Sequence, residues 1–538
     1  MKLAVIGLLV AVLAVSCGNP VSGQQAPPAA PLAPDALREW LTVLSSDEFE
    51  GRATFSQGID KAAEYIAARL KDAGVRPGGD NGSYFQNVGV QFVQSLNQST
   101  LTVEVNGESR VFQNGEEVFF PANVGGKRTL VLTDVEFVGY GLHMGSTHND
   151  YDGKDVKGKA VVWLGESAPV SLDGSPATRL MESRASTALE EMGAAASVSL
   201  ARSSRGRFGS GGPVSFTTTQ RLDFPRPPDI SVSDGVLAFI FSASGVDYEE
   251  LKAKARSGQD LIPAAIKGVK LTFNLDAEYR VVNTRMTRNV VGLVDGSDPK
   301  LKDTYVAFGA HYDHLGIEEG VRLSTEIDRI NNGADDDGSG STALIGLATA
   351  FAAGPRPRRS FLFAWHAGEE RGLWGSQYLA DHPPVPVDHI VAQLNIDMIG
   401  RNRDNKDSEE NTVYAVGADR VSTELHNILI ESNASLNAPL NIDFEMNDPA
   451  DPERIYFRSD HFSYAAKGIP IIFFFTGLHP DYHQVTDSVE KIHFEKMSHI
   501  TQLVYEIGLR LANLDHAPVR DFKGPRMGRG SSGKIDRN

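Results

Sequence analysis

Short apolar runs that alternate with helical segments dominate the second half of the chain. Four runs have the length of a strand and are apolar almost throughout: residues 304–310, 360–367, 389–396 and 469–475. Between them lie stretches with helical spacing, such as residues 341–352. Strands that are hydrophobic on both faces are typical of a sheet covered by helices on both sides. The pattern therefore predicts an α/β fold with a mixed central sheet and helices on both faces.

The chain before this sheet follows a different pattern. Residues 60–73 place small and aliphatic side chains at helical spacing, and Gly74 follows as a stop signal. Beyond them, short alternating runs separated by Asn-Gly and Gly-Gly predict strands and turns. Residues 115–270 carry none of the clustered ligand-type side chains described below. We therefore predict a β-rich insert at 115–270, which divides the catalytic domain into residues 35–114 and 271–515.

The amino terminus has the pattern of an export signal. An apolar run from Leu3 to Val15 is shorter than the ~20 residues needed to span a bilayer, and Ser16 and Cys17 follow it. This arrangement resembles the lipobox of bacterial lipoproteins, in which Cys17 is lipidated; a secretory peptide cut elsewhere is the alternative. We predict a signal peptide at 1–16 and a location in the bacterial cell envelope. The lipid on Cys17 would anchor the protein to the outer membrane, facing the periplasm or the exterior.

Composition narrows the choices further. The 538 residues exceed the roughly 250–300 that one hydrophobic core supports, so at least two domains are expected. The formal charge of −17 argues against a nucleic-acid binder, which needs clustered Lys and Arg. A single cysteine excludes an intramolecular disulfide and a Cys-rich zinc finger, so any metal must be held by His, Asp and Glu. Residues 17–34 and 516–538 have the composition of a tether and a disordered tail.

Residues able to bind metal follow each of the four apolar runs. In chain order they are His311 and Asp313, Glu369 and Glu370, Asp397, and Asp481 to His483, while three aspartates at 335–337 precede a helix. The carboxyl ends of strands in an open α/β sheet meet at one edge, so these side chains should converge. Imidazole and carboxylate are the ligands of catalytic zinc. The sequence contains neither His-Glu-x-x-His nor Gly-x-Ser-x-Gly, which argues against a helical zincin and a serine hydrolase.

These residues lie in motifs that resemble a known family. HYDHLG, NNGADDDGSG, AGEERGLWGS, NIDMIG, RSDH and DYHQVTDSVEKI stand in the order found in the co-catalytic zinc aminopeptidase family, whose relatives include glutamate carboxypeptidase and the transferrin receptor. The resemblance runs from about Leu37 to Leu514. The middle segment DVEFVGYGLHMGSTHNDYDGKDVKGKAVVWL is similar to a protease-associated domain. The resemblance implies a zinc exopeptidase fold that this domain interrupts.

The resemblance also implies a metal-ligand set with two Zn²⁺ ions per chain. One zinc would be held by His311 and Asp397, and the other by Glu370 and His483. Asp336 would bridge them, because the family's pattern places this ligand directly before Asp-Gly.

Three neighbouring residues take other roles by the same resemblance. Glu369 would be the general base that accepts a proton from the metal-bridging water. The carboxylate of Asp313 would fix the tautomer of the His311 imidazole. Tyr482 matches the position from which some members donate a hydrogen bond to the tetrahedral oxyanion. No role follows for Asp460 or His461, although both lie in a family motif.

We therefore expect a metallo-exopeptidase of the aminopeptidase type, with peptides as substrates, no nucleic-acid partner, and membrane contact only through a lipidated Cys17. The same family resemblance leaves other outcomes open: a carboxypeptidase or dipeptidase, a glutaminyl cyclase, or a non-catalytic binding protein. A carboxypeptidase needs a cation for the substrate carboxylate, and Arg458 and Arg371 are the candidates. Zinc content separates the cyclase and the binding protein from the main prediction, because the former uses one zinc and the latter has lost ligands.

Overall fold

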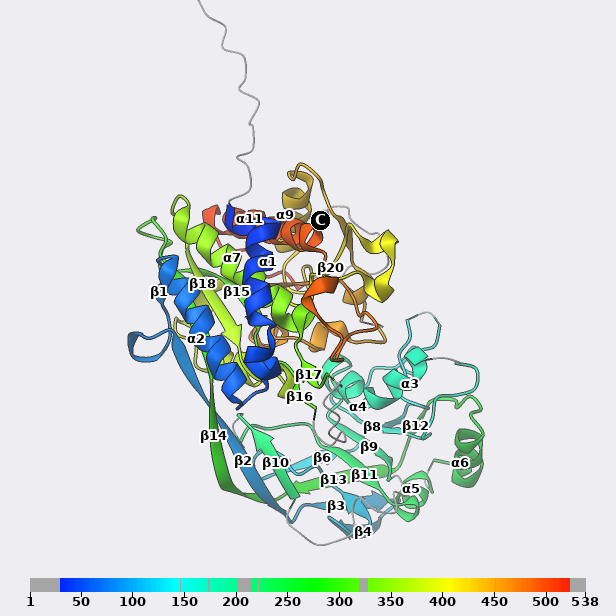
Figure 1. The fold of residues 1–538 in the computed structure, drawn as a ribbon. Helices are drawn as coiled ribbons and strands as arrows, with labels where there is room; N and C mark the ends of the chain where they lie inside the picture. The colour runs from blue at the N-terminus through cyan, green and yellow to red at the C-terminus, as the bar shows by residue number, and fades with distance from the viewer. Residues whose placement is uncertain are drawn as a thin grey trace, which may run out of the picture.

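The computed structural model describes residues 30–522, except 146, 173–174, 202–213, 220–221, 243, 319–327 and 450. The described chain forms two parts, an α/β part built around a large sheet and a smaller β-rich lobe (Figure 1). Among the described residues, no helix combines the length and the apolar character required to cross a membrane. The predicted signal peptide at 1–16 and most of the tether at 17–34 lie outside the described residues.

The α/β part contains a ten-stranded mixed sheet, which confirms the predicted fold class. Nine strands follow one another across it and β1 pairs with β14 beside this path. In spatial order they are β10 (Val214–Thr218), β2 (Phe85–Asn97), β14 (Ala277–Val294), β18 (Ser360–His366), β15 (Tyr305–His311), β19 (Ile390–Ile396), β22 (Ile471–Phe475), β20 (Thr412–Val416) and β21 (Asn441–Asp443), with β1 at Arg76–Pro77.

The four predicted apolar strands form the middle of this sheet. Strands β18, β15, β19 and β22 are neighbours and run parallel to one another. All residues of these four strands are buried apart from Tyr305, which is half-buried. Their continuous hydrophobicity follows from this placement, because helices cover both faces.

Helices cover the two faces of the sheet unequally. On one face Phe308 and neighbouring side chains pack against five helices, and on the other Ala307 and its neighbours pack against two. The first group is α1 (Pro34–Leu44), α2 (Gln57–Asp72), α7 (Gly340–Ala353), α9 (Thr423–Ala434) and α11 (Phe494–Asn513); the second is α8 (Trp374–Asp381) and α10 (His461–Ala465). Helix α2 confirms the helix predicted at 60–73 and begins three residues earlier, where Ser56 caps it.

The lobe is built on two further sheets that share one hydrophobic core. The six-stranded sheet has the order β12 (Ala264–Ile266), β7 (Val135–Phe137), β8 (Ala160–Trp163), β9 (Ala196–Leu200), β11 (Asp229–Val232) and β5 (Val118–Phe119). The four-stranded sheet has the order β4 (Glu108–Gln113), β3 (Thr100–Val105), β13 (Val269–Leu275) and β6 (Arg128–Leu132). Helices α3 (Ser175–Glu182), α5 (Asp234–Phe241) and α6 (Tyr248–Arg256) lie beside them (Figure 1).

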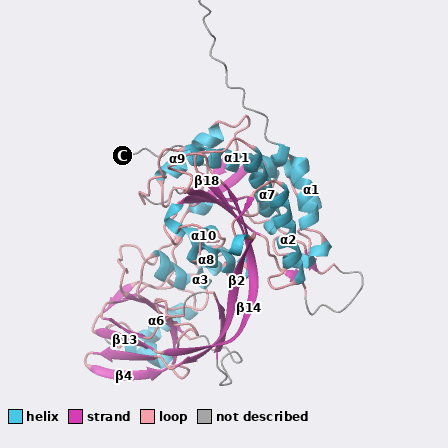
Figure 2. Cartoon of the chain, turned by 90° about the vertical axis from the view of Figure 1, so that its left-hand side faces the viewer, coloured by secondary structure: helices cyan, strands magenta, loops and turns pink. Residues whose placement is uncertain are grey.

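The lobe is larger than the insert predicted at 115–270. Strands β3 and β4 precede residue 115, and β13 runs past residue 270, yet all three belong to the four-stranded lobe sheet. The chain leaves the central sheet along β2 and returns along β14, which pairs with it from Asn97–Ala277 to Phe85–Val290 (Figure 2). The lobe therefore lies between residues 98 and 276. Strand β10 departs from the lobe and pairs with β2 at the edge of the central sheet.

The chain beyond α11 also differs in part from the predicted tail at 516–538. Residues 516–522 are described, and they contact the amino-terminal end of α9. The carboxylate of Asp521 accepts a hydrogen bond from the Thr423 amide (3.1 Å), and Glu424 accepts one from the Val519 amide (3.0 Å). Free amides at a helix start attract carboxylates, which explains why so polar a segment is held here. Residues 523–538 lie outside the described chain.

Candidate metal centre

The predicted ligands meet at the carboxyl ends of the four parallel strands. His311 is the last residue of β15, Asp397 follows β19 directly, and Glu369 and Glu370 stand in a 3₁₀ turn shortly after β18. Asp336 comes from the turn before α7. His483 comes from the loop after β22. The structure thus brings together all the residues for which the sequence predicted ligand or base roles.

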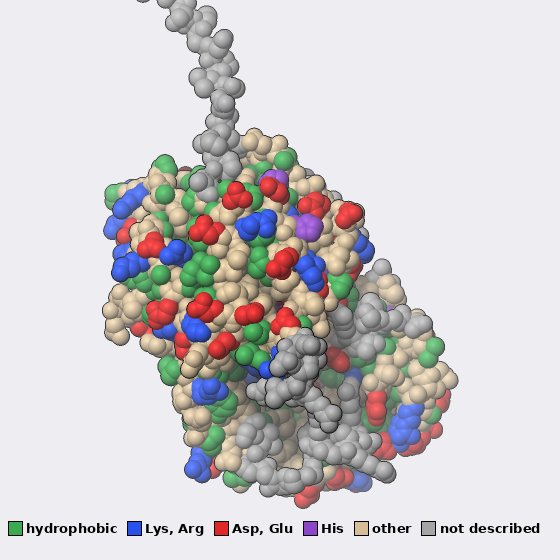
Figure 3. Space-filling model, in the orientation of Figure 1, with side chains coloured by type: hydrophobic (Ala, Val, Ile, Leu, Met, Phe, Trp, Pro, Cys, Tyr) green, Lys and Arg blue, Asp and Glu red, His purple; other side chains and the backbone are tan. Residues whose placement is uncertain are grey.

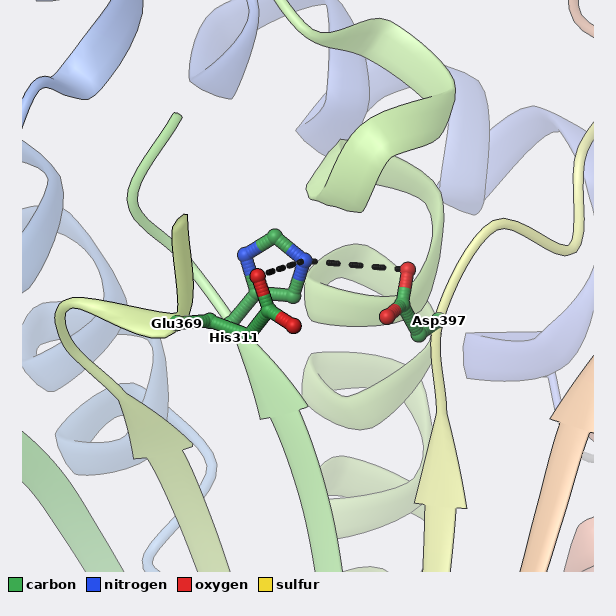
Figure 4. Close-up of side chains that lie close together, drawn as sticks. All are labelled: His311, Glu369 and Asp397. Atoms are coloured by element: carbon green, nitrogen blue, oxygen red, sulfur yellow. Dashed lines mark ion pairs between the residues drawn. The ribbon is translucent and has the colours of Figure 1, made fainter. Parts of the chain in front are cut away.

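His311 is the centre of a first group of ligand-type atoms. Its Nε2 lies 3.2 Å from Asp336 Oδ1, 3.6 Å from Asp397 Oδ1 and 4.0 Å from Glu369 Oε2. In Figure 4, dashed lines join the imidazole of His311 to the carboxylates of Glu369 and Asp397, which come from the chain beyond the ends of two different strands. The imidazole and Asp397 are buried.

A second group forms around the other oxygen of Asp336. His483 Nε2 lies 3.2 Å from Asp336 Oδ2 and 3.2 Å from Glu370 Oε2. One carboxylate therefore faces two groups of ligands, with Oδ1 toward His311 and Oδ2 toward His483. This is the geometry that a carboxylate bridging two metal ions requires.

His314 also reaches the second group, although the sequence prediction gave it no role. Its Nδ1 lies 2.8 Å from Glu370 Oε1 and 3.8 Å from Asp336 Oδ2. Two ligand atoms on one tetrahedral zinc lie about 3.3 Å apart, from bond lengths near 2.0 Å. The distances of His483 match that spacing, whereas the 2.8 Å contact of His314 is a hydrogen bond. His314 therefore orients Glu370, and His483 fits the ligand position.

The neighbours of Asp336 are engaged elsewhere, which distinguishes the three consecutive aspartates. Asp335 Oδ1 accepts a hydrogen bond from the Gly400 amide (2.6 Å). Asp337 accepts hydrogen bonds from the amides of His311 (3.1 Å) and Met398 (3.2 Å). Both fix the backbone of other ligand-bearing loops, so Asp336 alone of the three points between the two histidines.

The electrostatics of the cluster favour positive charge at this point. Burial lowers the pKa of His311, but the carboxylates of Asp397 and Glu369 outweigh it and raise the pKa well above its usual value. Burial likewise opposes protonation of His483, and Asp336 and Glu370 raise its pKa to about 10. Carboxylates that converge in a buried place need protons or a cation between them.

Two carboxylate oxygens of the cluster are buried without a hydrogen-bond partner, as expected of atoms that bind a metal ion. Asp336 Oδ2 and Asp397 Oδ1 are buried and accept no hydrogen bond. Buried carboxylate oxygens are normally satisfied, so an orphaned pair in a histidine-carboxylate cluster fits a metal ion. The donor set of nitrogen and oxygen atoms suits zinc. Nitrogen and oxygen atoms of His311, Glu369 and Asp397 lie within 4.8 Å of one another, and so do those of His314, Asp336 and Glu370, which shows how closely the base and the orienting histidine approach the ligands.

Asp313 differs from its predicted role. The Nδ1 atom of His311 hydrogen-bonds to the backbone carbonyl of Asp313 (3.1 Å), while the carboxylate lies 3.7 Å away, too far for a hydrogen bond. The carboxylate instead accepts hydrogen bonds from the Glu369 amide (3.1 Å) and from Thr54 Oγ1 (2.9 Å). A carbonyl can only accept, so it still fixes the Nδ1–H tautomer of His311, as was expected of the side chain.

Glu369 has the environment of a proton acceptor. Its carboxylate is nearly buried at the edge of the pocket, and burial raises its pKa well above the usual range. His311 opposes this shift, while the charges of Glu370 and Asp397 reinforce it. A carboxylate with a raised pKa takes up a proton more readily than an ordinary one, as a general base must.

Tyr482 lies over the second group. Its ring stacks on the imidazole of His483, with centroids 3.8 Å apart, and its hydroxyl accepts a hydrogen bond from Arg458 (3.1 Å). Arg458 also donates to Glu453 (3.1 Å), so this candidate for binding a substrate carboxylate is already paired. Both side chains line a pocket that opens beside His311 and Asp336. The rest of that pocket wall is mainly apolar: Met398, Ile455, Phe473, Phe475 and Leu478.

The residues of the RSDH motif make buried contacts close to the ligands, and one of them binds a predicted ligand directly. Ser459 Oγ donates a hydrogen bond to Asp397 Oδ2 (2.7 Å). The carboxylate of Asp460 lies 3.1 Å from His366 Nδ1, and both side chains are fully buried. His461 contacts the Tyr456 carbonyl (2.7 Å), and burial lowers its pKa to about 3. The family motif was the one sequence signal noted at Asp460 and His461, and it assigned neither of them a role.

Comparisons with known proteins match the part of the chain that carries these residues. Residues 289–508 match the model of peptidase family M28. A probable leucine aminopeptidase of Trichophyton verrucosum is 28% identical over 236 residues, which are 42% of this chain and 58% of the relative. A probable zinc metalloprotease of Pyrenophora tritici-repentis is 31% identical over 185 residues, covering 32% of this chain and 37% of that protein.

A solved aminopeptidase from Aneurinibacillus sp. strain AM-1 is similar over nearly the full length, with 92% of this chain and 98% of that chain covered. Its sequence identity is 18% and its TM-score 0.46. Against the curated leucine aminopeptidases, the chain spans less than two thirds of their length, 56–58%.

Proposed function

Because residues 289–508 belong to peptidase family M28, we propose that this chain is a zinc-dependent exopeptidase that removes residues from the amino terminus of peptides. One observation carries the proposal. Asp336 faces His311 with one carboxylate oxygen and His483 with the other. Glu369 lies beside His311 and is not required as a ligand in either group, so it is free to act as a base. This arrangement supports two metal ions per chain and a separate base.

Each side chain then has a defined task. When bound, zinc would polarise the scissile carbonyl and make a water more acidic. His311 and Asp397 would hold one ion, Glu370 and His483 the other, with Asp336 between them.

The proton moves through Glu369. Its carboxylate accepts a proton from the attacking water and returns it to the leaving amine, so the peptide bond breaks with no net consumption of acid. Tyr482 lies beside His483, where its hydroxyl can donate to the oxygen that becomes negative at the carbonyl carbon. The apolar wall formed by Met398, Phe473 and Phe475 excludes water and suits an uncharged side chain of the first residue.

The names of the relatives and the pairing of Arg458 support an aminopeptidase. Matched sequences are described as probable leucine aminopeptidases, and an apolar pocket suits a leucine side chain. Arg458, which a carboxypeptidase would need for the substrate carboxylate, already donates to Glu453 and to Tyr482.

Two glutamates that are neighbours in sequence provide the test. Glu369→Gln keeps the shape of the side chain but cannot take a proton, so turnover should fall by about 10²–10⁴ with zinc content unchanged. Glu370→Gln exchanges a charged ligand for a neutral one, so the zinc content itself should fall. If Glu369→Gln keeps full activity, the mechanism is wrong; if both variants lose zinc equally, Glu369 is a ligand.

A peptide panel tests the direction of attack. Leucine-containing dipeptides with a free amine should be cleaved, and the same dipeptides with an acetylated amine should not. The opposite preference, with cleavage lost when the carboxylate is amidated, would assign a carboxypeptidase. Wild-type protein purified without bound zinc, and inactive after zinc is added, would exclude a metallopeptidase altogether.

The lobe at 98–276 and the amino terminus complete the proposal. We assign the lobe to the protease-associated type, which is supported by its β-rich sheets and by its position beside the pocket loops. Cys17 lies outside the described residues, and we propose that it carries a lipid anchor. Cys17→Ser should then release the protein from membranes with unchanged specific activity. Wild-type protein that is soluble and carries an unmodified cysteine would contradict this.

A further inference from the structure

A short amino-terminal segment, residues 50–54, spans the end of the 3₁₀ turn Asp47–Arg52, precedes helix α2 and reaches the back of the metal centre. It lies far outside the residues that match the family model. Its central residue, Arg52, has no solvent-exposed surface. A fully buried arginine is rare and demands partners for its five N–H groups.

Arg52 donates hydrogen bonds to the backbone of two ligand-bearing loops. Its Nε donates to the Tyr312 carbonyl (2.9 Å), one residue after His311. Its Nη1 donates to the Asn332 carbonyl (2.7 Å) and its Nη2 to the Gly333 carbonyl (2.8 Å), shortly before Asp336. A fourth bond, from Nη1 to the Leu44 carbonyl (2.9 Å), holds the end of α1. One planar guanidinium therefore connects the loop of His311 with the loop of Asp336.

The backbone around Arg52 is shaped for this contact. Glu50, Gly51 and Arg52 all have left-handed conformations, with φ of 51°, 65° and 52°. A non-glycine residue in this region costs of order 1–3 kcal/mol, so the surroundings must hold it there. At Gly51 an added Cβ would lie 2.5 Å from the Asn331 carbonyl oxygen and 2.8 Å from Gly316. The segment is thus inserted tightly between the two loops.

Two further contacts join the same segment to the site. The Arg52 carbonyl accepts a hydrogen bond from the His314 amide (3.2 Å). Thr54 Oγ1 donates to the carboxylate of Asp313 (2.9 Å), which in turn accepts the Glu369 amide (3.1 Å). Asp337 and Asp336 lie close enough to interact with the Arg52 charge. The cation thus offsets part of the negative charge that the ligand cluster gathers.

We propose that Arg52 is a positioning residue for the metal centre: its guanidinium fixes the spacing between the loops of His311 and Asp336, and so sets the affinity for the ion these two residues share. The proposal rests on the metal site of the proposed function. The hydrogen bonds of the Arg52 guanidinium go to backbone carbonyls, and it acts on the ligands through those of Tyr312, Asn332 and Gly333. Supports of this kind typically change metal affinity by about 10–100-fold.

The test compares metal affinity with stability in variants of the full chain. Zinc affinity is measured by competition with a chromophoric chelator, and Tm is measured with and without zinc. Arg52→Met should weaken zinc binding about 10–100-fold and shrink the rise in Tm that zinc produces. Arg52→Lys keeps the charge but cannot span both loops, so it should fold and show a smaller loss of affinity. It keeps the test valid if Arg52→Met does not fold.

Arg359 provides a matched control. It is an arginine that is almost fully buried and also donates to carbonyls, those of Leu511 and Leu514, at the opposite end of β18 from the ligands. Arg359→Met should lower Tm equally with and without zinc and leave zinc affinity unchanged. If both Arg52 variants behave in that way, the segment is only structural and the proposal is overturned. If the wild-type protein itself binds no zinc, the proposed function fails instead.

Discussion

Arg454 connects the α/β part to the lobe next to the pocket. Its Nη2 lies 2.8 Å from Glu191 Oε1, and its Nη1 donates to Thr187 Oγ1 (2.7 Å) and the Ser183 carbonyl (3.1 Å). The next residue, Ile455, lines the pocket beside His311. The two charged side chains expose only 9% and 12% of their surface, so the ion pair is largely shielded from water. We predict that Arg454→Ala loosens both the lobe and the pocket.

The size of the effect follows from what Arg454→Ala leaves behind. Burial raises the pKa of Glu191, although Arg454 and Arg420 lower it, so this carboxylate is poorly compensated even when paired. Removing one partner of a buried pair costs about 3–5 kcal/mol, and partial exposure places this pair near 3 kcal/mol. At roughly 2 cal/mol/K per residue, the unfolding entropy of 538 residues is about 1 kcal/mol/K. Tm should therefore fall by about 3 °C.

A double-mutant cycle isolates the ion pair from the other contacts of Arg454. Glu191→Ala alone should lower the free energy of unfolding by less than Arg454→Ala does. The loss in the double variant should be smaller than the sum of the two single losses by about 1–2 kcal/mol. Lys467→Ala is the matched control, because its ion pair with Asp381 (2.5 Å) is 40% exposed on both sides and should contribute at most about 1 kcal/mol.

Kinetics give the second measurement for Arg454→Ala. Peptides with a bulky first residue should show a higher KM, because Ile455 is no longer held against the pocket, while kcat for an alanine-first peptide should change little. Additive losses in the cycle, together with unchanged KM values, would show that the contact is incidental and refute the reasoning.

Three further predictions concern single side chains. Ser459→Ala removes the hydroxyl that donates to Asp397 (2.7 Å) and should weaken zinc binding about 10–100-fold in chelator competition; unchanged affinity would contradict this role. Tyr482→Phe should lower kcat about 10²–10³-fold with KM nearly constant, whereas a change in KM alone would indicate a packing role. Burial lowers the pKa of Lys496 to about 8, below its value in the unfolded chain. The unfolded state thus binds more protons between about pH 8 and 10.4, so wild-type stability relative to Lys496→Met should rise with pH there. A flat difference in Tm would exclude this.

The sequence predicted the features that follow from residues close together in the chain, namely the central strands and the ligands at their ends. Continuous apolar runs located the four central strands, and residues following their carboxyl ends located His311, Glu370 and Asp397. The rule that such ends share one edge of the sheet was enough to bring these ligands together. The choice of Asp336 over Asp335 came from the family motif, and the hydrogen bonds of Asp335 agree with it.

What the sequence did not predict depends on contacts between distant segments. The limits of the lobe were misplaced because alternation marks strands but not their partners. Strand β3 pairs with β13 far along the chain, with Val103 opposite Leu271, 168 residues later. The hydrogen bond to His311 was assigned to the carboxylate of Asp313, whereas the backbone carbonyl of Asp313 makes it. The spacing of residues in a motif does not fix the direction of a side chain. The burial of Arg52 was not predicted, because an arginine in a turn is normally exposed and local sequence does not mark the exceptions.

The pairing of β2 with β14 holds the two ends of the lobe segment next to each other. Since Asn97 and Ala277 are direct partners across two antiparallel strands, the chain enters and leaves the lobe at one point in space. A segment of any length can be exchanged there without altering the order of the strands that carry the ligands. An exchange would also remove β10, which pairs with β2 at the edge of the central sheet, together with the contacts of Arg454 with residues 183–191.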